Sequence, residues 1–225
     1  ELSNVVSGIA MNLRLIAAIA FVAAPFGVAL TKSEPAAVYN YKPSSEQAQA
    51  ALLATRFLTN FHYKRVPLDD AMSKTIFDRY LESLDGDKLF LTAADVSEFR
   101  GYADALDDAI FDQRLAPPFE IYARYVQRVA ERTAHARALL AKGFDFGVDE
   151  QYRFDREHAL WAADAKELDE LWRMRVKNDW LRLKLAGRDD QGIRDTLDKR
   201  YAGFEKRLGE LDGDDVFQTF MNAYS

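Results

Sequence analysis

Apolar residues recur every three or four positions through most of the chain from residue 44 onward. The face over residues 68–84 is typical of this pattern and carries Leu68, Met72, Ile76, Tyr80 and Leu84. An earlier segment has the same spacing at Leu53, Phe57 and Phe61. Residues spaced in this way lie on one side of an α-helix, whereas a half-buried strand would show strict alternation. The pattern therefore predicts a mainly α-helical, irregular multi-helix globular domain.

Start and stop signals divide this region into about six or seven helices. We expect them at 44–61, 68–84, 93–110, 117–142, 164–186, 190–211 and 214–225. The start signals are capping-box spacings or prolines, at Ser44 and Gln47, Thr92 and Asp95, Pro117 and Pro118, and Asp164 and Glu167. Gly143 and Gly187 are the expected C-terminal stops.

The apolar stripe of the last helix continues almost to the final residue. Its members are Val216, Phe217, Phe220, Met221 and Tyr224, and only Ser225 follows, with no Gly, Asn or Pro stop signal. We interpret this helix as unfinished, and we expect the sequence to be part of a longer protein.

One segment departs from the helical pattern. Phe144 and Phe146 alternate with polar residues, and Tyr152 and Phe154 do the same after a turn at Gly147. Alternation across a turn is typical of paired strands. It predicts a small hairpin near residues 144–155, with an ordered loop as the alternative.

Three segments precede the helical region. Residues 1–10 are expected to be an upstream extension. Residues 11–29 combine a basic residue, an apolar stretch and a proline breaker, as secretory signal peptides do. A retained membrane anchor is less favoured, because the apolar run is shorter than the ~20 residues of a membrane-spanning helix. Residues 30–44 resemble a linker, and 45–225 form the expected helical domain.

The composition excludes several classes of function. Lys and Arg number 30 against 36 Asp and Glu, so the chain lacks the basic excess that binding to a phosphate backbone requires. We therefore expect no nucleic-acid partner. Cysteine is absent, which excludes disulfides, thiolate metal sites and cysteine nucleophiles.

Candidate catalytic residues are few. The three histidines, His62, His135 and His158, stand alone without a metal-binding spacing. Ser73 or Ser97 could meet one of them in the fold, but no nucleophile motif surrounds either serine. We therefore expect no catalytic, cofactor-binding or metal-binding residue in this chain, and no cofactor.

Two acidic turns raise the question of calcium. Asp85, Asp87 and Asp95 could offer oxygen ligands, but Gly86 directly follows the first of them, which does not match an EF-hand loop. Near residue 212 a glycine also directly follows an aspartate, which is common in ordinary turns. Ordinary turns that connect helices are the favoured interpretation.

Cations and tryptophans are concentrated in the second half of the chain. Within 172–185 the cations are Arg173, Arg175, Lys177, Arg182 and Lys184. They could bind an acidic partner or a substrate carboxylate, although a solvated helix face is favoured. Trp161, Trp172 and Trp180 are expected in the core or at domain contacts.

Several long stretches resemble one known family. They are "HYKRVPLDDAMSKTIFDRYLESLD", "LFLTAADVSEF", "ELDELWRMRVKNDWLRLKLAGRDDQGIRDTLDKRY" and "DVFQTFMNAYS". Together they extend from about residue 50 to the C-terminus, in the order found in the N-terminal region of tail-specific, or carboxy-terminal-processing, proteases of bacterial envelopes.

The resemblance implies a parent protein that is a secreted serine endopeptidase acting on proteins with apolar C-termini. In that family a PDZ domain and a catalytic domain with a serine–lysine dyad follow the helical region. No dyad residue has a counterpart in this sequence, so the chain alone is expected to be inactive.

The resemblance also implies a role and a location. The expected role is to frame substrate entry and to contact the PDZ and protease domains, protein substrates and an adaptor lipoprotein. The expected location is the periplasm, with inner-membrane association as an option and only transient membrane contact through the signal peptide. The alternative is a free-standing periplasmic binding module without enzyme activity.

Overall fold

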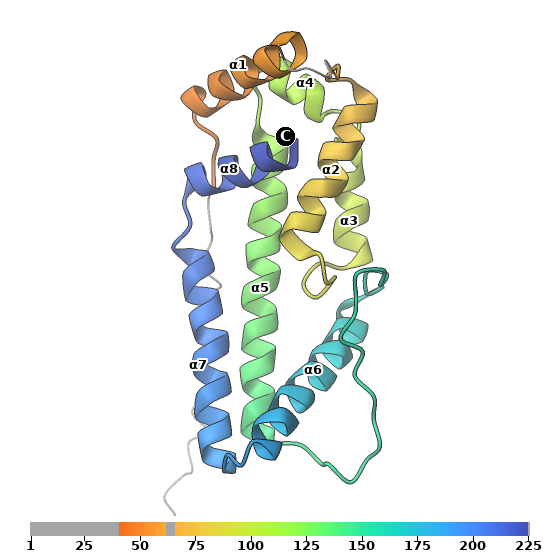
Figure 1. Cartoon of the computed structure of the whole chain (residues 1–225), viewed down its shortest axis with the longest axis vertical. Helices are drawn as coiled ribbons and strands as arrows, with labels where there is room; N and C mark the ends of the chain where they lie inside the picture. Colours follow the sequence, from red (N-terminus) through yellow and green to blue (C-terminus); the bar gives the residue numbers. More distant parts are fainter. Residues whose placement is uncertain (1–40, 62–65, 225) are drawn as a thin grey trace, which may run out of the picture. The chain divides into compact units, whose positions relative to one another are not determined.

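Residues 41–61 and 66–224 are described by a computed structural model and contain eight α-helices and one short 3-10 helix (Figure 1). The helices are α1 (Ser45–Phe61), α2 (Asp70–Asp85), α3 (Ala93–Phe99), η1 (Arg100–Tyr102), α4 (Leu106–Phe111), α5 (Ala116–Lys142), α6 (Ala165–Leu185), α7 (Asp190–Gly209) and α8 (Gly213–Tyr224). The mainly α-helical class is confirmed. The predictions for residues 1–10 and 11–29, and for most of 30–44, fall outside the described residues.

The expected helix over 93–110 is divided into three pieces, which raises the helix count above the predicted six or seven. Ala103 and Ala105 donate to carbonyls only three residues back, at Arg100 and Tyr102. The next amide, that of Leu106, donates 2.9 Å to the buried Ser73 hydroxyl on α2 instead of a carbonyl of the preceding turn. The helix is therefore interrupted before α4 begins.

The predicted helix ends are largely confirmed. Ser44 and Gln47 exchange the two bonds of a capping box, at 2.9 and 3.2 Å. Thr92 and Asp95 form a second box at the start of α3. After α5 and α6, Gly143 and Gly187 have φ angles of +74° and +82°, which other residues adopt only with strain.

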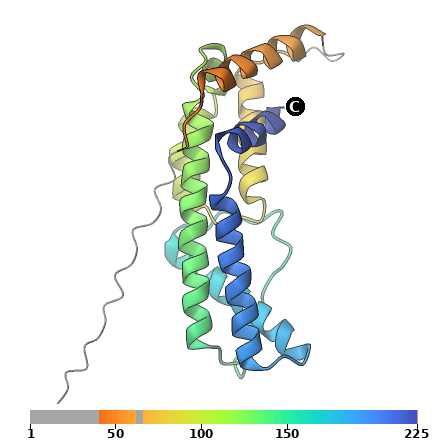
Figure 2. The same cartoon turned by 90° about the vertical axis from the view of Figure 1, so that its left-hand side faces the viewer.

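Helix α5 is the central element and packs against α4, α6, α7 and α8. Figures 1 and 2 both show α7 running beside α5. The first half of α5 joins α1, α2, α3, α4 and α8 around one apolar core. Its second half joins α6 and α7 around another. None of the helices in the described segments combines the length and hydropathy needed to cross a membrane.

Most of the apolar stripe of α8 is buried inside this domain. Val216 and Phe220 are fully buried, and Ala223 and Tyr224 nearly so, because α8 packs against α2, α5 and α1. The ring of Phe220 meets that of Tyr80 edge-on. Phe217 and Met221, the other members of the stripe, are half-buried against the same core. Most of the stripe is therefore covered by helices of this domain.

The apolar face predicted for α1 is present, but it is exposed. Leu53, Phe57 and Phe61 are 64%, 64% and 75% exposed. The buried side of α1 consists of smaller or polar residues, among them Ala51 and Thr55. The helix thus packs mainly through small residues and Leu58, and leaves Leu53, Phe57 and Phe61 uncovered.

The hairpin predicted near 144–155 does not form, and the ordered-loop alternative is what the structure has. Phe144 and Phe146 pack toward α6, where Phe144 lies 5.7 Å from the Trp180 ring. Tyr152 and Phe154 instead contact each other, with ring centroids 5.0 Å apart. The alternating aromatic residues of this segment therefore contact α6 or each other, and they do not belong to paired strands.

Candidate functional site

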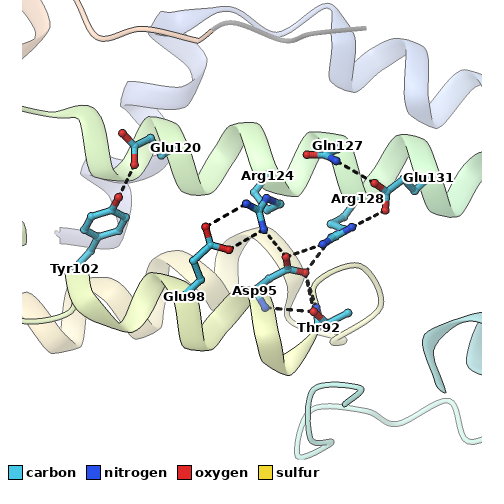
Figure 3. A network of polar contacts seen from close by, with 9 residues as sticks. All are labelled: Thr92, Asp95, Glu98, Tyr102, Glu120, Arg124, Gln127, Arg128 and Glu131. Carbon is cyan, nitrogen blue, oxygen red and sulfur yellow. Dashed lines mark hydrogen bonds and ion pairs between the residues drawn. The ribbon is translucent and has the colours of Figure 1, made fainter. Parts of the chain in front are cut away.

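A polar network joins α3 to α5, and Asp95 lies at its centre (Figure 3). The Asp95 carboxylate accepts from Arg124 at 2.7 Å and from Arg128 at 2.8 and 2.9 Å. It also accepts from the backbone and hydroxyl of Thr92. The two carboxylate oxygens of Glu98 accept hydrogen bonds from the guanidinium of Arg124 at 3.0 and 3.2 Å. Both carboxylate oxygens of Asp95 are thus occupied by donors of this domain.

These contacts control the charge of Asp95. Burial by itself would raise the pKa of this carboxyl, which is only 2% exposed. The hydrogen bonds from Arg128, Thr92 and Arg124 outweigh burial and hold the pKa well below its usual range. Asp95 is therefore an ionised anchor for two arginines of α5, and its role is structural.

Asp85 organises the turn that follows α2. Its carboxylate accepts from the amides of Leu89, Phe90 and Leu91 at 2.7, 2.9 and 2.8 Å. Burial raises the pKa of Asp85 to about 6, although the three amides and Lys88 oppose the shift. The amides of this turn thus occupy both carboxylate oxygens of Asp85, one of the three aspartates considered for calcium.

No group of three or more His, Asp or Glu side chains suited to a metal ion occurs among the residues that the structure describes. Asp87 is exposed, and Asp95 lies in the α3–α5 network. The Asp-Gly turn near residue 212 caps α8, since Asp212 accepts from the amides of Asp214 and Asp215.

The cations of α6 find acidic partners within the same chain. Arg173 and Lys177 both bind Glu150 of the loop between α5 and α6, and Lys184 binds Asp190 at 3.1 Å. The other two cations make cation–π contacts: Arg175 lies over the Trp172 ring and Arg182 lies over the Phe154 ring. These cations hold the 143–163 loop on α6, so neither a purely solvated face nor a free substrate-binding patch describes them.

The candidate nucleophiles have structural or solvent-facing positions. Ser73 is fully buried and its hydroxyl accepts from Leu106, while Ser97 is exposed on α3. His135 faces Asp169, with 3.8 Å between Nδ1 and the carboxylate, and His158 is exposed. No hydrogen bond joins either serine to a histidine within the described segments, and His62 lies outside them.

The tryptophans occupy the places expected of core residues. Trp172 and Trp180 are 2% exposed, and the Trp172 indole donates to the Leu89 carbonyl at 2.6 Å. Trp161 is half-buried beneath Lys88. Trp172 thus fixes the turn after α2 to α6.

A pocket that the sequence did not predict lies between the turn after α2 and helices α6 and α7. It has a volume of about 300 Å³. Its lining includes Arg175, Arg200 and Arg207 beside a cluster of aromatic rings. Arg200 and Arg207 are separated by two helical turns on α7, a weak signal that is also found on many solvated helix faces.

Comparison with known proteins places the chain in a family. Residues 54–225 match the family model described as the tail specific protease N-terminal domain. The chain is 36% identical over 183 residues to the tail-specific protease of Haemophilus influenzae, an alignment that covers 81% of this chain and 26% of that protein. It therefore spans about a quarter of the length of this relative. The chain belongs to the tail-specific protease family and contains its N-terminal domain.

Proposed function

We propose that this chain supplies the non-catalytic helical domain of a tail-specific serine endopeptidase. The match to an N-terminal domain, in a relative of which the alignment covers only 26%, is the observation that carries the proposal. The serine–lysine dyad and the PDZ domain then belong to the rest of the full-length protein. The position of Ser73 supports this division, because its buried hydroxyl is already used to start α4.

The exposed face of α1 is the surface that we assign to contact with the rest of the protease. Leu53, Phe57 and Phe61 form a row of large apolar side chains, and the last two rings lie 5.4 Å apart. Contiguous apolar surface of this kind marks interfaces more often than it marks free surface. Covering it would position this domain beside the other domains, where it would frame the entrance for protein substrates.

The experiment compares cleavage of an unfolded protein substrate by full-length protein with and without residues 45–224. A fluorophosphonate probe should label the full-length protein and leave the 225-residue chain unlabelled. Labelling of the 225-residue chain that Ser73→Ala or Ser97→Ala removes would overturn the non-catalytic role.

The α1 contact has its own test in the full-length protein. Phe57→Asp should increase hydrogen exchange in α1 and lower the rate of cleavage, because a charge cannot be buried at an apolar interface without a partner. Gln49→Asp, on the exposed surface of the same helix, is the matched control. Equal effects of the two substitutions would contradict the assigned contact.

We further propose that residues 11–29 direct the protein to the periplasm, where an adaptor lipoprotein docks on it. The composition of this segment supports the first part. Cell fractionation of full-length protein with and without residues 11–29 tests it. Retention of the intact protein in the periplasm after the deletion would rule the signal out.

A further inference from the structure

Residues 148–154, in the loop between α5 and α6, have the sequence of a β-strand but pair with no strand in the described part of the chain. The stretch reads "VDEQYRF", which contains strand-favouring Val, Tyr and Phe and neither Gly nor Pro. Its side chains alternate in their contacts. Glu150 and Tyr152 bind α6, whereas Asp149 and Arg153 are exposed and make no hydrogen bond or ion pair with a described residue.

The main chain of residues 149–154 is unpaired as well. Its amides and carbonyls form no hydrogen bond with any residue that the structure describes. Most of these residues are exposed, and Figure 1 shows the stretch as part of a long open run between α5 and α6. Free N–H and C=O groups along an exposed edge are a template for pairing with another extended chain.

Contacts with α6 hold this edge in place. Glu150 accepts hydrogen bonds from Arg173 and Lys177, and the Tyr152 hydroxyl accepts from Arg175 at 3.3 Å. A segment that is already fixed loses less conformational entropy when a partner pairs with it. The unpaired edge is therefore presented by an ordered part of the domain.

The stretch is complementary to itself when two copies run antiparallel. A two-fold axis at Gln151 places Asp149 of each copy opposite Arg153 of the other. The same register places Val148 opposite Phe154, and these side chains are 55% and 59% exposed. Opposite charges and aromatic–β-branched pairs both stabilise antiparallel strands, and a two-fold axis brings one surface against itself.

We propose that two copies of this chain pair through residues 148–154, with the two-fold axis at Gln151. The charge pattern selects a second copy as the occupant of this edge, because an unrelated segment would need an acid and a base at the same spacing. One short strand pair buries much less than the ~800 Å² per partner of a stable interface, so we expect a dissociation constant on the order of 100 µM.

Sedimentation velocity of the 225-residue chain at about 10 µM to 1 mM measures this association. Asp149→Arg and Arg153→Asp should each weaken it about tenfold or more, because like charges then meet on both sides of the axis. An equimolar mixture of the two variants should restore it, since every cation again meets an acid. Asp78→Arg, an exposed position on α2 with the same change of charge, is the matched control and should have no effect.

Cross-linking tests the position of the axis. The chain has no cysteine, so Gln151→Cys introduces a single thiol. Residues directly opposite each other in antiparallel strands are close enough for a disulfide, and oxidation should give a covalent dimer. Gln191→Cys, at an exposed position on α7, is the control and should remain mostly monomeric.

Three results would overturn the proposal. They are a monomer at every concentration, association that neither charge substitution changes, and equal cross-linking of the two cysteine variants. None of these measurements uses cleavage activity or labelling by a fluorophosphonate, so this proposal and the proposed function can fail separately.

Discussion

The ring of Phe220 in α8 lies edge-on against that of Tyr80 in α2, with centroids 5.6 Å apart. The two residues are separated by most of the domain in sequence, and both side chains are fully buried. Their contact joins the last helix of the described chain to one of the first. It covers the centre of the apolar stripe of α8 with a residue of the same domain.

Replacement of Phe220 by alanine should strongly destabilise the 225-residue chain. Loss of a fully buried phenylalanine removes its transfer free energy and leaves a cavity, so the free energy of unfolding should fall by about 3–5 kcal/mol. Urea denaturation measures the change. Phe57→Ala is the matched control and should stay within about 0.5 kcal/mol, because Phe57 is largely exposed. Similar losses for both variants would show that α8 is not packed as described.

Asp95→Asn should loosen α3 from α5. Removing the charge leaves Arg124 and Arg128 without their shared acceptor, at a cost of about 2–3 kcal/mol. This lies below the cost of breaking a fully buried pair, because the arginine side chains remain 28% and 26% exposed. Glu98→Gln, which removes a more exposed partner of Arg124, should cost less than about 1 kcal/mol.

The same carboxylate predicts a dependence of stability on pH. The folded-state pKa of Asp95 lies well below its ordinary value of 3.8, so its stabilisation is present above about pH 4 and is lost as the pH falls further. Denaturation at pH 7 and pH 3 should show that the difference between wild type and Asp95→Asn shrinks at the lower pH. A difference that stays constant would contradict the ionised anchor.

The pKa of Asp85 is shifted in the opposite direction from that of Asp95. Burial raises its pKa from 3.8 to about 6, so its contribution to stability is fully present below pH 3.8 and declines as the pH rises through 6. Carbon-13 NMR of the side-chain carboxyl should give a midpoint near pH 6. A midpoint at or below 4 would mean that the three amide donors outweigh the effect of burial.

Glu150→Gln should release the 143–163 loop from α6. The hydrogen bonds from Arg173 and Lys177 lower the pKa of Glu150 to about 2, so the contact should persist well below pH 4.5 in the wild type. Limited proteolysis with trypsin should then cut faster at Arg153 in the variant. Glu157→Gln is the control in the same loop, since its side chain makes no hydrogen bond or ion pair within the described residues. Equal cutting rates would show that Glu150 does not hold the loop.

Local signals in the sequence were sufficient for the helical class and for most helix ends. The capping boxes at Ser44 and Thr92 and the stop at Gly143 act within a few residues of themselves. The break before α4 was not predictable in this way. It depends on the Ser73 hydroxyl, which is 33 residues from the Leu106 amide that it binds.

Apart from the break before α4, the sequence by itself determined where the helices form and which side chains lie together on each of them. Only the tertiary structure decided which faces are buried, because burial depends on the helix that packs opposite. On this basis the stripe with Phe220 is covered and the row with Phe57 is exposed, although both have helical spacing. The pairing of Asp95 with Arg128, and of Glu150 with Lys177, was decided in the same way, since side chains far apart in sequence meet only after the helices have packed.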